Sequence, residues 1–261
     1  MAEKLMVSIY QALAARVEIN KAGVLCTIIR TRGSTPRHAA SKMLVYPEGH
    51  ILGTVGGGGL EQQVITASLE ALRDGQPRLL EFNMIDPSRG DVGVCGGTVE
   101  VFVEPILPKP LLVVIGAGHV GKAVAHLAQW LGFRVAVNDD RAEFCTPEAV
   151  PDADEFYPCA MADLPNQLAI TPWTYLVLTT RGVDMDVPGL PALLDTPAAY
   201  LGVIGSRRRW AEARKQLLDA GMAEEKLACV HTPIGLDIHA ETPEEIAVSI
   251  LGEIIALRNE V

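Results

Sequence analysis

The stretch Leu111-Leu-Val-Val-Ile-Gly-Ala-Gly-His-Val-Gly121 decides the fold. Its first five residues form a continuous apolar run, which is typical of a buried strand. Gly116, Gly118 and Gly121 then form a Gly-x-Gly-x-x-Gly pattern that opens a helix. The first glycine permits a tight turn, the second lets the backbone approach a pyrophosphate, and the third lets the helix pack closely on the strand. The pattern predicts a Rossmann-type dinucleotide-binding unit.

Acidic residues stand where such a unit binds a ribose. Asp139 lies 23 residues after Gly116, at the end of the second expected strand, and Asp140 follows it. His119 opens the helix, whose free N–H groups can hold an anion. Arg141 leaves NAD and NADP undecided, because an arginine there favours a 2′-phosphate or is simply solvated. A Rossmann scaffold whose nucleotide site is empty or reused is the alternative.

Apolar runs and helical stretches alternate through the rest of the second half. Alternation of this kind predicts a parallel sheet covered by helices on both faces, which is a doubly wound α/β fold. The further strands are expected at Arg134–Val137, Tyr175–Leu178, Tyr200–Ile204 and Ala228–Val230, and the helices near 119–131, 210–220 and 243–258. Thr242, Pro243 and Glu245 predict a capping box at the start of the last helix.

The first hundred residues predict a separate α+β domain. A helix is expected from Leu5 to Val17 and another from Leu60 to Leu72; the expected strands are Gly23–Ile29, Met43–Tyr46, His50–Leu52 and Thr98–Glu104. Pro105-Ile-Leu-Pro-Lys-Pro110 follows, and such a cluster of prolines is unsuited to a helix interior or a central strand. We therefore expect a domain boundary there, with one domain over residues 1–106 and a Rossmann-like domain over 109–261.

Composition narrows the class of protein. The chain has 261 residues, of which 49% are hydrophobic, and a formal net charge of -10. Such a chain is too apolar to be disordered and too acidic for a general nucleic-acid or membrane-surface binder. No run approaches the roughly 18 apolar residues that span a bilayer. Five widely spaced cysteines fit neither a disulfide framework nor a zinc site, so we expect a reduced, cytoplasmic protein.

Two further segments are rich in groups that bind anions. The four glycines Gly56–Gly59 precede a helix, and the N–H groups of Gly56, Gly57 and Gly58 can form an anion-binding nest. Ser34, Arg37 and Lys42 supply hydroxyl and cationic groups in the same domain. If these segments converge in space, they suit a phosphorylated ligand; a flexible connector is the alternative reading of the glycines.

Arginines also cluster between the strand near residue 204 and the following helix, in Gly205-Ser-Arg-Arg-Arg209. Cations at a helix N-terminus oppose the helix dipole, so an anion or an acidic surface would explain Arg207 and its neighbours, whereas a solvated face is equally consistent. The segment Thr179–Asp186 follows another strand and offers Arg181 and aspartates, but no histidine or lysine that could relay a proton.

Cys95 is the cysteine with a functional setting. It precedes Gly96 and Gly97, so a bulky partner could reach its thiol. The thiol could carry sulfur, act as a nucleophile or bind a soft metal, or it could be a small buried residue. Cys26 lies inside an apolar run and is expected in the core.

Taken together, these segments resemble the xanthine dehydrogenase accessory (XdhC/CoxI) family over nearly the whole chain. The similar stretches are Gly33–Arg37, Lys42-Met43, Gly53–Gly58 with Glu61, Cys95–Gly97, Gly116–Gly121, Asp139–Arg141, Tyr200–Arg208, His231–Asp237 and Glu241–Ile246. The chain departs from the family at three positions. The family often has glycine where Ala40 and His239 stand, and histidine where Val183 stands.

The resemblance implies a chaperone that binds molybdenum cofactor, as molybdopterin or a dinucleotide form, supports its sulfuration and inserts it into an apo molybdenum hydroxylase of the xanthine dehydrogenase type. A cysteine desulfurase would supply the sulfur, and a homodimer would suit a dimeric client. The glycine loop with Arg37 and Lys42 would hold the pterin phosphate, and Cys95 would contact molybdenum or carry sulfur. The Rossmann half would bind NAD(P) or the nucleotide of the cofactor.

Two other functions stay open at this point. One is an NAD(P)-dependent oxidoreductase with an unusual N-terminal domain. The other is a Rossmann scaffold that acts through protein contacts alone.

Overall fold

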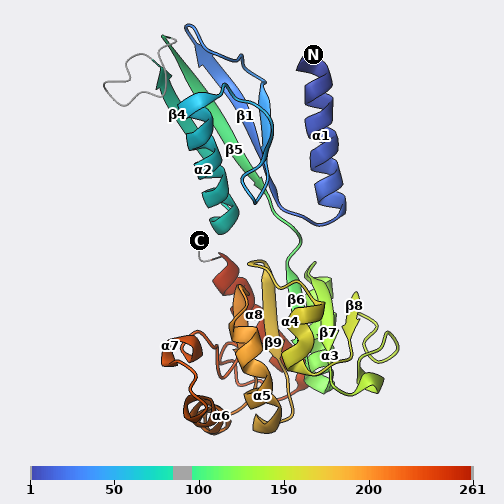
Figure 1. Cartoon of the computed structure of the whole chain (residues 1–261). Coiled ribbons are helices and arrows are strands. Elements are labelled where there is room, and N and C mark those ends of the chain that lie inside the picture. Colours follow the sequence, from blue (N-terminus) through green and yellow to red (C-terminus); the bar gives the residue numbers. More distant parts are fainter. Residues whose placement is uncertain (1, 85–95, 260–261) are drawn as a thin grey trace. The chain divides into compact units, whose positions relative to one another are not determined.

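The computed structural model describes residues 2–84 and 96–259, with side chains from residue 8 onward. The chain divides into two compact units, Met1–Pro108 and Lys109–Val261. Their boundary falls inside the proline-rich segment Pro105–Pro110, and each unit contains a five-stranded sheet (Figure 1). Among the described residues, every helix is too short or too polar to span a bilayer.

The first unit is an antiparallel sheet with two long helices. Its elements are α1 (Ala2–Glu18), β1 (Gly23–Arg32), β2 (Lys42–Val45), β3 (Ile51–Gly53), α2 (Gly58–Asp74), β4 (Arg78–Met84) and β5 (Gly97–Ile106). The strands lie in the order β3-β2-β1-β5-β4, and every neighbouring pair is antiparallel. The expected α+β architecture of this half is thereby confirmed.

The two helices of this unit cover opposite faces of the sheet. Successive residues of a strand point to opposite faces. Leu25 of β1 packs with Ile9 of α1, whereas the Sγ atom of the next residue, Cys26, lies 3.2 Å from the Oγ atom of Ser68 in α2. Figure 1 shows the sheet between α1 and α2. Side chains on β1 therefore belong alternately to two apolar layers.

The second unit has a parallel sheet. Its elements are β6 (Leu111–Ile115), α3 (His119–Trp130), β7 (Arg134–Asn138), β8 (Glu155–Tyr157), α4 (Leu164–Gln167), β9 (Thr174–Leu178), α5 (Val183–Leu194), β10 (Tyr200–Val203), α6 (Arg207–Asp219), α7 (Glu224–Leu227) and α8 (Pro243–Asn259). The order β10-β9-β6-β7-β8 reverses direction between β6 and β9, as in the nucleotide-binding half of a Rossmann fold. The doubly wound fold is confirmed.

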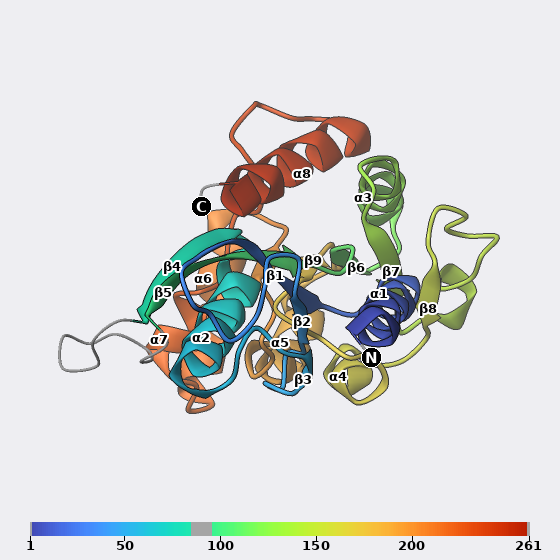
Figure 2. The same ribbon diagram turned by 90° about the horizontal axis from the view of Figure 1, so that it is seen from above.

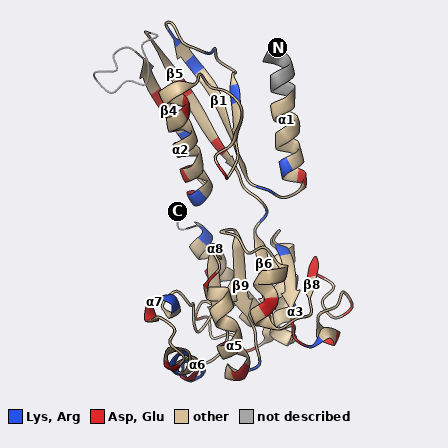
Figure 3. Ribbon diagram, viewed as in Figure 1, with Lys and Arg blue, Asp and Glu red and all other residues tan. Residues whose placement is uncertain are grey.

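Apolar layers lie on both faces of this parallel sheet. One layer joins alternate strand residues such as Leu112 and Val114 to α3 and α8, and the other joins Val113 and Ile115 to α5 and α6. Figure 2 shows α3 and α8 together on one side of the strands and α5 on the other. The strands β6 and β9 carry no charged residue, so they are uniformly tan in Figure 3, while α6 and α7 carry both signs of charge.

Several local expectations were wrong, and the strand β4 (Arg78–Met84) was not expected at all. Ala228–Val230 is not a strand, because the chain makes only one isolated bridge there, from His231 to Gly202. The short strand β8 was not expected, because all three of its residues are half-buried and so leave no continuous apolar run. Pro105 lies inside β5 opposite Val24, and it is tolerated there because the pairing with β4 stops at Val103.

The backbone is strained at Ala40 and His239, two positions where the sequence departs from the family that it resembles. Both residues have a left-handed conformation, with φ of 70° and 57° respectively. A side chain is disfavoured in that region, whereas glycine adopts it freely. The glycine often found at these positions in the family therefore has a physical reason.

Replacing Ala40 by glycine is expected to raise the free energy of unfolding of the first unit by about 0.5–1 kcal/mol, because the strain is relieved and the exposed methyl group loses no packing. Ala14→Gly is the matched control, since Ala14 is exposed within α1 and its replacement should cost about 1 kcal/mol. Urea denaturation measures both, and a loss of stability in Ala40→Gly would contradict the prediction.

Candidate functional site

The glycine fingerprint has the geometry that its sequence predicts. Gly116 has φ of 108°, and a β-carbon there would lie 2.7 Å from the carbonyl oxygen of Thr179. A β-carbon on Gly121 would collide with the carbonyl oxygen of Gly116. Gly118 differs, because its φ is -74° and open space lies where its β-carbon would stand. Two glycines are thus required by packing, and the third leaves room for a ligand.

The helix that follows has an open N-terminus. α3 begins at His119, its N-cap Gly118 provides no side-chain acceptor, and its first turn contains no acidic residue. The first N–H groups of a helix carry a partial positive charge and attract an anion. His119 is exposed on this first turn. The end of α3 therefore offers donors to an anion beside the space at Gly118.

Asp139 is held inside the protein rather than presented to solvent. Its residue is 4% exposed. One carboxylate oxygen accepts the N–H of Ala117 at 2.8 Å, and the two oxygens accept Nε and Nη2 of Arg141 at 2.9 Å each. Burial raises the pKa of Asp139, but the hydrogen bonds from Arg141 and Ala117 outweigh it and lower the pKa overall. Arg141 also lies over the Phe144 ring, 3.8 Å from its centroid.

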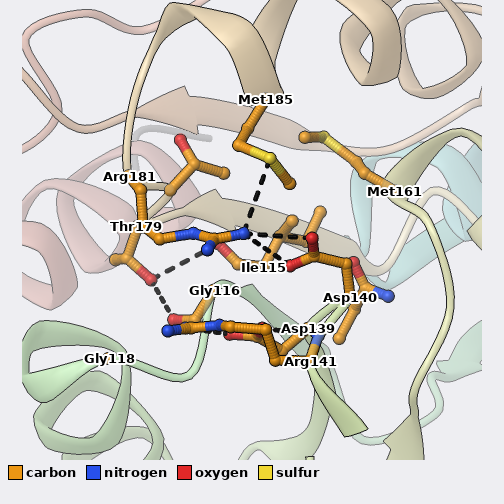
Figure 4. Close-up of a pocket in the computed structure, with 12 residues that line it drawn as sticks. Ile115, Gly116, Gly118, Asp139, Asp140, Arg141, Met161, Thr179, Arg181 and Met185 are labelled. Carbon is orange, nitrogen blue, oxygen red and sulfur yellow. Dashed lines mark hydrogen bonds and ion pairs between the residues drawn. The ribbon is translucent and has the colours of Figure 1, made fainter. Parts of the chain in front are cut away.

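Asp140 is exposed and paired across the crevice. Its two oxygens accept Nη2 of Arg181 at 2.8 and 3.0 Å, and the side chains of Asp140 and Arg181 are 38% and 51% exposed. The same nitrogen lies 3.6 Å from the Sδ atom of Met185. Figure 4 shows Arg181 extending over the crevice toward Asp140. This ion pair joins the ends of β7 and β9.

A single crevice collects these groups. Most of its lining comes from the carboxyl ends of the three central strands β6, β7 and β9 and the loops after them, with Met161 added from the turn after β8 and Met185 from α5. The lining residues are Ile115, Gly116, Gly118, Asn138, Asp139, Asp140, Arg141, Met161, Thr179, Thr180, Arg181 and Met185. It lies where the strand order reverses, which is where open α/β sheets bind ligands. The structure thus brings together the predicted residues Gly116, Gly118, Asp139 and Asp140.

The cluster Arg207–Arg209 lies in the first turn of α6, not before the helix as expected, because Ser206 caps the helix and accepts the N–H of Arg209 at 3.2 Å. Arg209 binds the buried Asp186, with Nη2 2.7 Å from the carboxylate, and donates to the carbonyl oxygen of Thr180 at 3.0 Å. A carboxylate inside the protein therefore explains one arginine. Arg207 is exposed.

The predicted segments of the first unit meet in part. A β-carbon on Gly33 would lie 2.9 Å from the carbonyl oxygen of Gly96, and one on Gly56 would lie 3.2 Å from the Pro36 ring. The segment that contains Ser34 and Arg37, both exposed, therefore lies against the residues after Cys95 and against the glycine loop. Cys95 itself is outside the described residues.

The glycine loop has a conformation that only glycine adopts easily. Gly56, Gly57 and Gly58 all have positive φ, and open space lies where β-carbons of Gly57 and Gly58 would stand. Gly57 caps α2 without a side-chain acceptor. Thr54 donates its hydroxyl to Glu61 in the first turn of α2 at 2.5 Å. The N–H of Gly56 donates to the Thr54 hydroxyl at 3.1 Å, so the open space coincides with the backbone of Gly57 and Gly58, beside the Glu61 carboxylate.

The Lys42 side chain is directed to the α1 face of the sheet, although its backbone carbonyl oxygen accepts the N–H of Thr54 at 3.2 Å. Its Nζ atom donates to the hydroxyl of Thr27 at 3.0 Å and lies 5.8 Å from the centroid of the Tyr10 ring in α1. Lys42 shares the α1 face of the sheet with Leu44, whereas the glycine loop leads into α2 on the other face. The Lys42 ammonium group and α2 therefore lie on opposite faces of the sheet.

Cys26 is in the core, as expected. Burial raises the pKa of its thiol to about 11, against a smaller lowering by the hydrogen bond with Ser68.

A residue that the sequence analysis missed organises the segment His231–Asp237. Glu253 of α8 accepts the Tyr200 hydroxyl at 3.0 Å, lies 3.0 Å from Nδ1 of His231, and accepts the N–H of Gly235. No local sequence pattern marks Glu253, because its partners are distant along the chain.

The capping box at Thr242 and Glu245 is confirmed, because each residue's N–H donates to the other's side chain.

Replacing Asp139 by asparagine is expected to lower the free energy of unfolding of the second unit by about 1–3 kcal/mol, because Arg141 would lose its buried counter-charge. The folded-state pKa of Asp139 is lowered, so its contribution is complete at neutral pH and decreases as the pH falls below the ordinary value of 3.8. Denaturation of Asp139→Asn from pH 7 to pH 3 measures this. Asp140→Asn is the control and should change stability by less than about 1 kcal/mol.

Two family models match this chain in succession. A model described as the XdhC and CoxI family matches residues 17–83, and one described as the XdhC Rossmann domain matches residues 112–254. The second match alone covers more than half of the chain.

Curated relatives agree with these models. The protein YqeB of Escherichia coli K12, described as uncharacterised, is 39% identical over 97% of this chain and 46% of its own length. A Bacillus subtilis 168 protein described as a probable xanthine dehydrogenase subunit is 34% identical over 63% of this chain and 48% of its own length. The molybdenum cofactor insertion chaperone PaoD of Escherichia coli K12 is 25% identical over 91% of this chain and 84% of its own length.

The chain spans about half the length of the first two relatives and most of the third. Its Rossmann strand order, its fingerprint geometry and the two matches are mutually consistent. The chain belongs to the XdhC and CoxI family.

Proposed function

We propose that this protein is an accessory factor that binds molybdenum cofactor and delivers it to an apo molybdenum hydroxylase of the xanthine dehydrogenase type. The observation that carries the proposal is family membership together with a relative, named a molybdenum cofactor insertion chaperone, that is matched over most of both chains. The cofactor is then the cargo of the protein and not a group that it retains for catalysis.

Two features of the chain fit a phosphorylated cargo. The Rossmann crevice has open space at Gly118 beside the uncapped start of α3. In the first unit, Gly57 and Gly58 have open space at the uncapped start of α2, next to the segment with Arg37. N–H groups at a helix start suit a phosphate. A pterin phosphate would suit the site in the first unit, and a nucleotide would suit the crevice in the second.

The finer parts of the proposal concern sulfur. Cys95 precedes Gly96 and Gly97 in the sequence, and the backbone of these glycines lies against Gly33 and Ser34. In this proposal the Cys95 thiol contacts molybdenum or carries sulfur. A cysteine desulfurase would be the sulfur donor, which makes it a second partner beside the client hydroxylase. A homodimer and a cytoplasmic location belong to the same proposal, since the client would be a dimeric enzyme matured inside the cell.

An NAD(P)-dependent oxidoreductase is the second candidate, and the crevice disfavours it. Hydride transfer to a carbonyl needs a proton donor near the cofactor. The residues that line the described crevice include no histidine, lysine or tyrosine. The hydroxyls of Thr179 and Thr180 already donate to Gly116 and Asp186. The crevice therefore favours nucleotide binding over hydride transfer to a carbonyl as its role.

The full chain, purified without oxygen, is expected to bind molybdopterin or its dinucleotide form with micromolar affinity or better and to activate a cofactor-free hydroxylase. Cofactor fluorescence after gel filtration and the recovered hydroxylase activity measure the two steps. Folded protein that neither retains the cofactor nor activates the client would refute the proposal.

Replacing Cys95 by serine is expected to leave cofactor retention within about twofold while activation of the client falls at least tenfold, because a thiol and a hydroxyl differ in sulfur and molybdenum chemistry. Cys229→Ser is the matched control, since Cys229 is an exposed thiol in the other unit. Unchanged activation by Cys95→Ser would remove the thiol from the mechanism.

A further inference from the structure

Asp139 and Asp140, the two carboxylates at the end of β7, differ in exposure and in hydrogen-bond partners. Spacing from the glycine fingerprint favours Asp139 as the residue that binds a ribose. The Asp139 carboxylate, however, is buried and already accepts hydrogen bonds from the Ala117 N–H and from Nε and Nη2 of Arg141. A ligand could use Asp139 only by breaking the hydrogen bond from Ala117, which holds the loop Gly116–Gly118 after β6. Asp139 is therefore a positioning residue for that loop.

The Arg141 side chain is also held by contacts within the protein. A 2′-phosphate, as in NADP, is usually held by an arginine near this position. Here Arg141 forms two hydrogen bonds to Asp139 and lies against Phe144. Turning it toward a phosphate would leave the Asp139 carboxylate buried without its counter-charge, which is strongly unfavourable. The Arg141 guanidinium is thus unavailable to a 2′-phosphate.

Asp140 has the accessible oxygens. It follows the same strand and lines the crevice, and its side chain is 38% exposed. Its ion pair with Arg181 lies in solvent, and such pairs contribute little and are easily exchanged. Because Arg181 follows β9 and Asp140 follows β7, the pair crosses the point where the strand order reverses (Figure 4). The pair therefore spans the region where open α/β sheets generally bind a ligand.

We propose that the crevice selects a ribonucleotide with a free 2′,3′-diol, which binds Asp140 by displacing Arg181, while its phosphate lies at Gly118 and the start of α3. Such a nucleotide places hydroxyl donors at the exposed carboxylate, whereas a 2′-phosphate places a second anion beside Asp140. The inference deepens the proposed function, since the nucleotide is either free or part of a dinucleotide form of the cofactor.

Calorimetric titration of the full chain tests this with matched ligands: NAD against NADP, and ADP and CDP each against its 2′-deoxy analogue. The hydroxyl-bearing member of at least one pair is expected to bind about tenfold or more tightly, because hydrogen bonds to a charged group are strong. In Asp140→Ala this ratio should fall below about twofold. Asp237→Ala is the matched control, because that carboxylate is exposed elsewhere in the unit, and its ratio should stay at the wild-type value.

Two more variants test the displacement and the location. Arg181→Met keeps the length of the side chain but frees Asp140, so nucleotide affinity should rise about two- to fivefold, as expected for loss of an exposed ion pair. Gly118→Ala is compatible with the backbone there and should preserve the melting temperature while binding falls at least tenfold, because the methyl group fills the phosphate space.

Tighter binding of NADP or of the deoxy analogues, an unchanged ratio in Asp140→Ala, or weaker binding in Arg181→Met would overturn the inference. Absence of binding of every nucleotide at millimolar concentration would overturn it as well. Because molybdopterin uptake and client activation are measured separately, these results are distinguishable from failure of the proposed function.

Discussion

The hydrogen bond between the Asp139 carboxylate and the Ala117 N–H is the constraint on which the crevice depends. It ties the loop after β6 to the end of β7 and orients the glycine backbone. A buried carboxylate is stable only with strong partners, and Arg141 supplies them. The bond, the ion pair and the close approach of Gly121 to Gly116 together fix the first turn of α3. The open start of that helix is thus held rigidly before any ligand arrives.

Much of the fold was predictable, because its signals are local. Leu111–Ile115 and Tyr175–Leu178 are continuous apolar runs in the sequence, and both are fully buried strands in the structure. Two of the failures have a common cause. β8 is held by its pairing with β7 without being deeply buried, and Ala228–Val230 is apolar without being paired. Strand formation in these places depends on neighbours distant in sequence, which a pattern of residues cannot reveal.

The site was predictable where backbone geometry governs it and not where long-range contacts do. The roles of Gly116 and Gly121 follow from their spacing, because steric fit in the turn is local. The different roles of Asp139 and Asp140 do not follow from their spacing, since they depend on contacts with Ala117 and Arg181. Likewise, the partner of Arg209 lies in another helix. In the first unit, the sequence grouped Lys42 with the glycine loop, but alternation along β2 turns its side chain to the α1 face.

The edge of the parallel sheet at β10 has a consequence for self-association. An exposed strand edge is a template for pairing with another chain. Here His231 forms one bridge to Gly202, the N–H of Val203 donates to His231, and Ile234 and the Tyr200 hydroxyl lie where a side chain on Gly202 would stand. Glu253 fastens this segment to α8. The segment around His231, which forms no sixth strand, thereby covers the edge at β10 and protects the sheet from edge-to-edge aggregation.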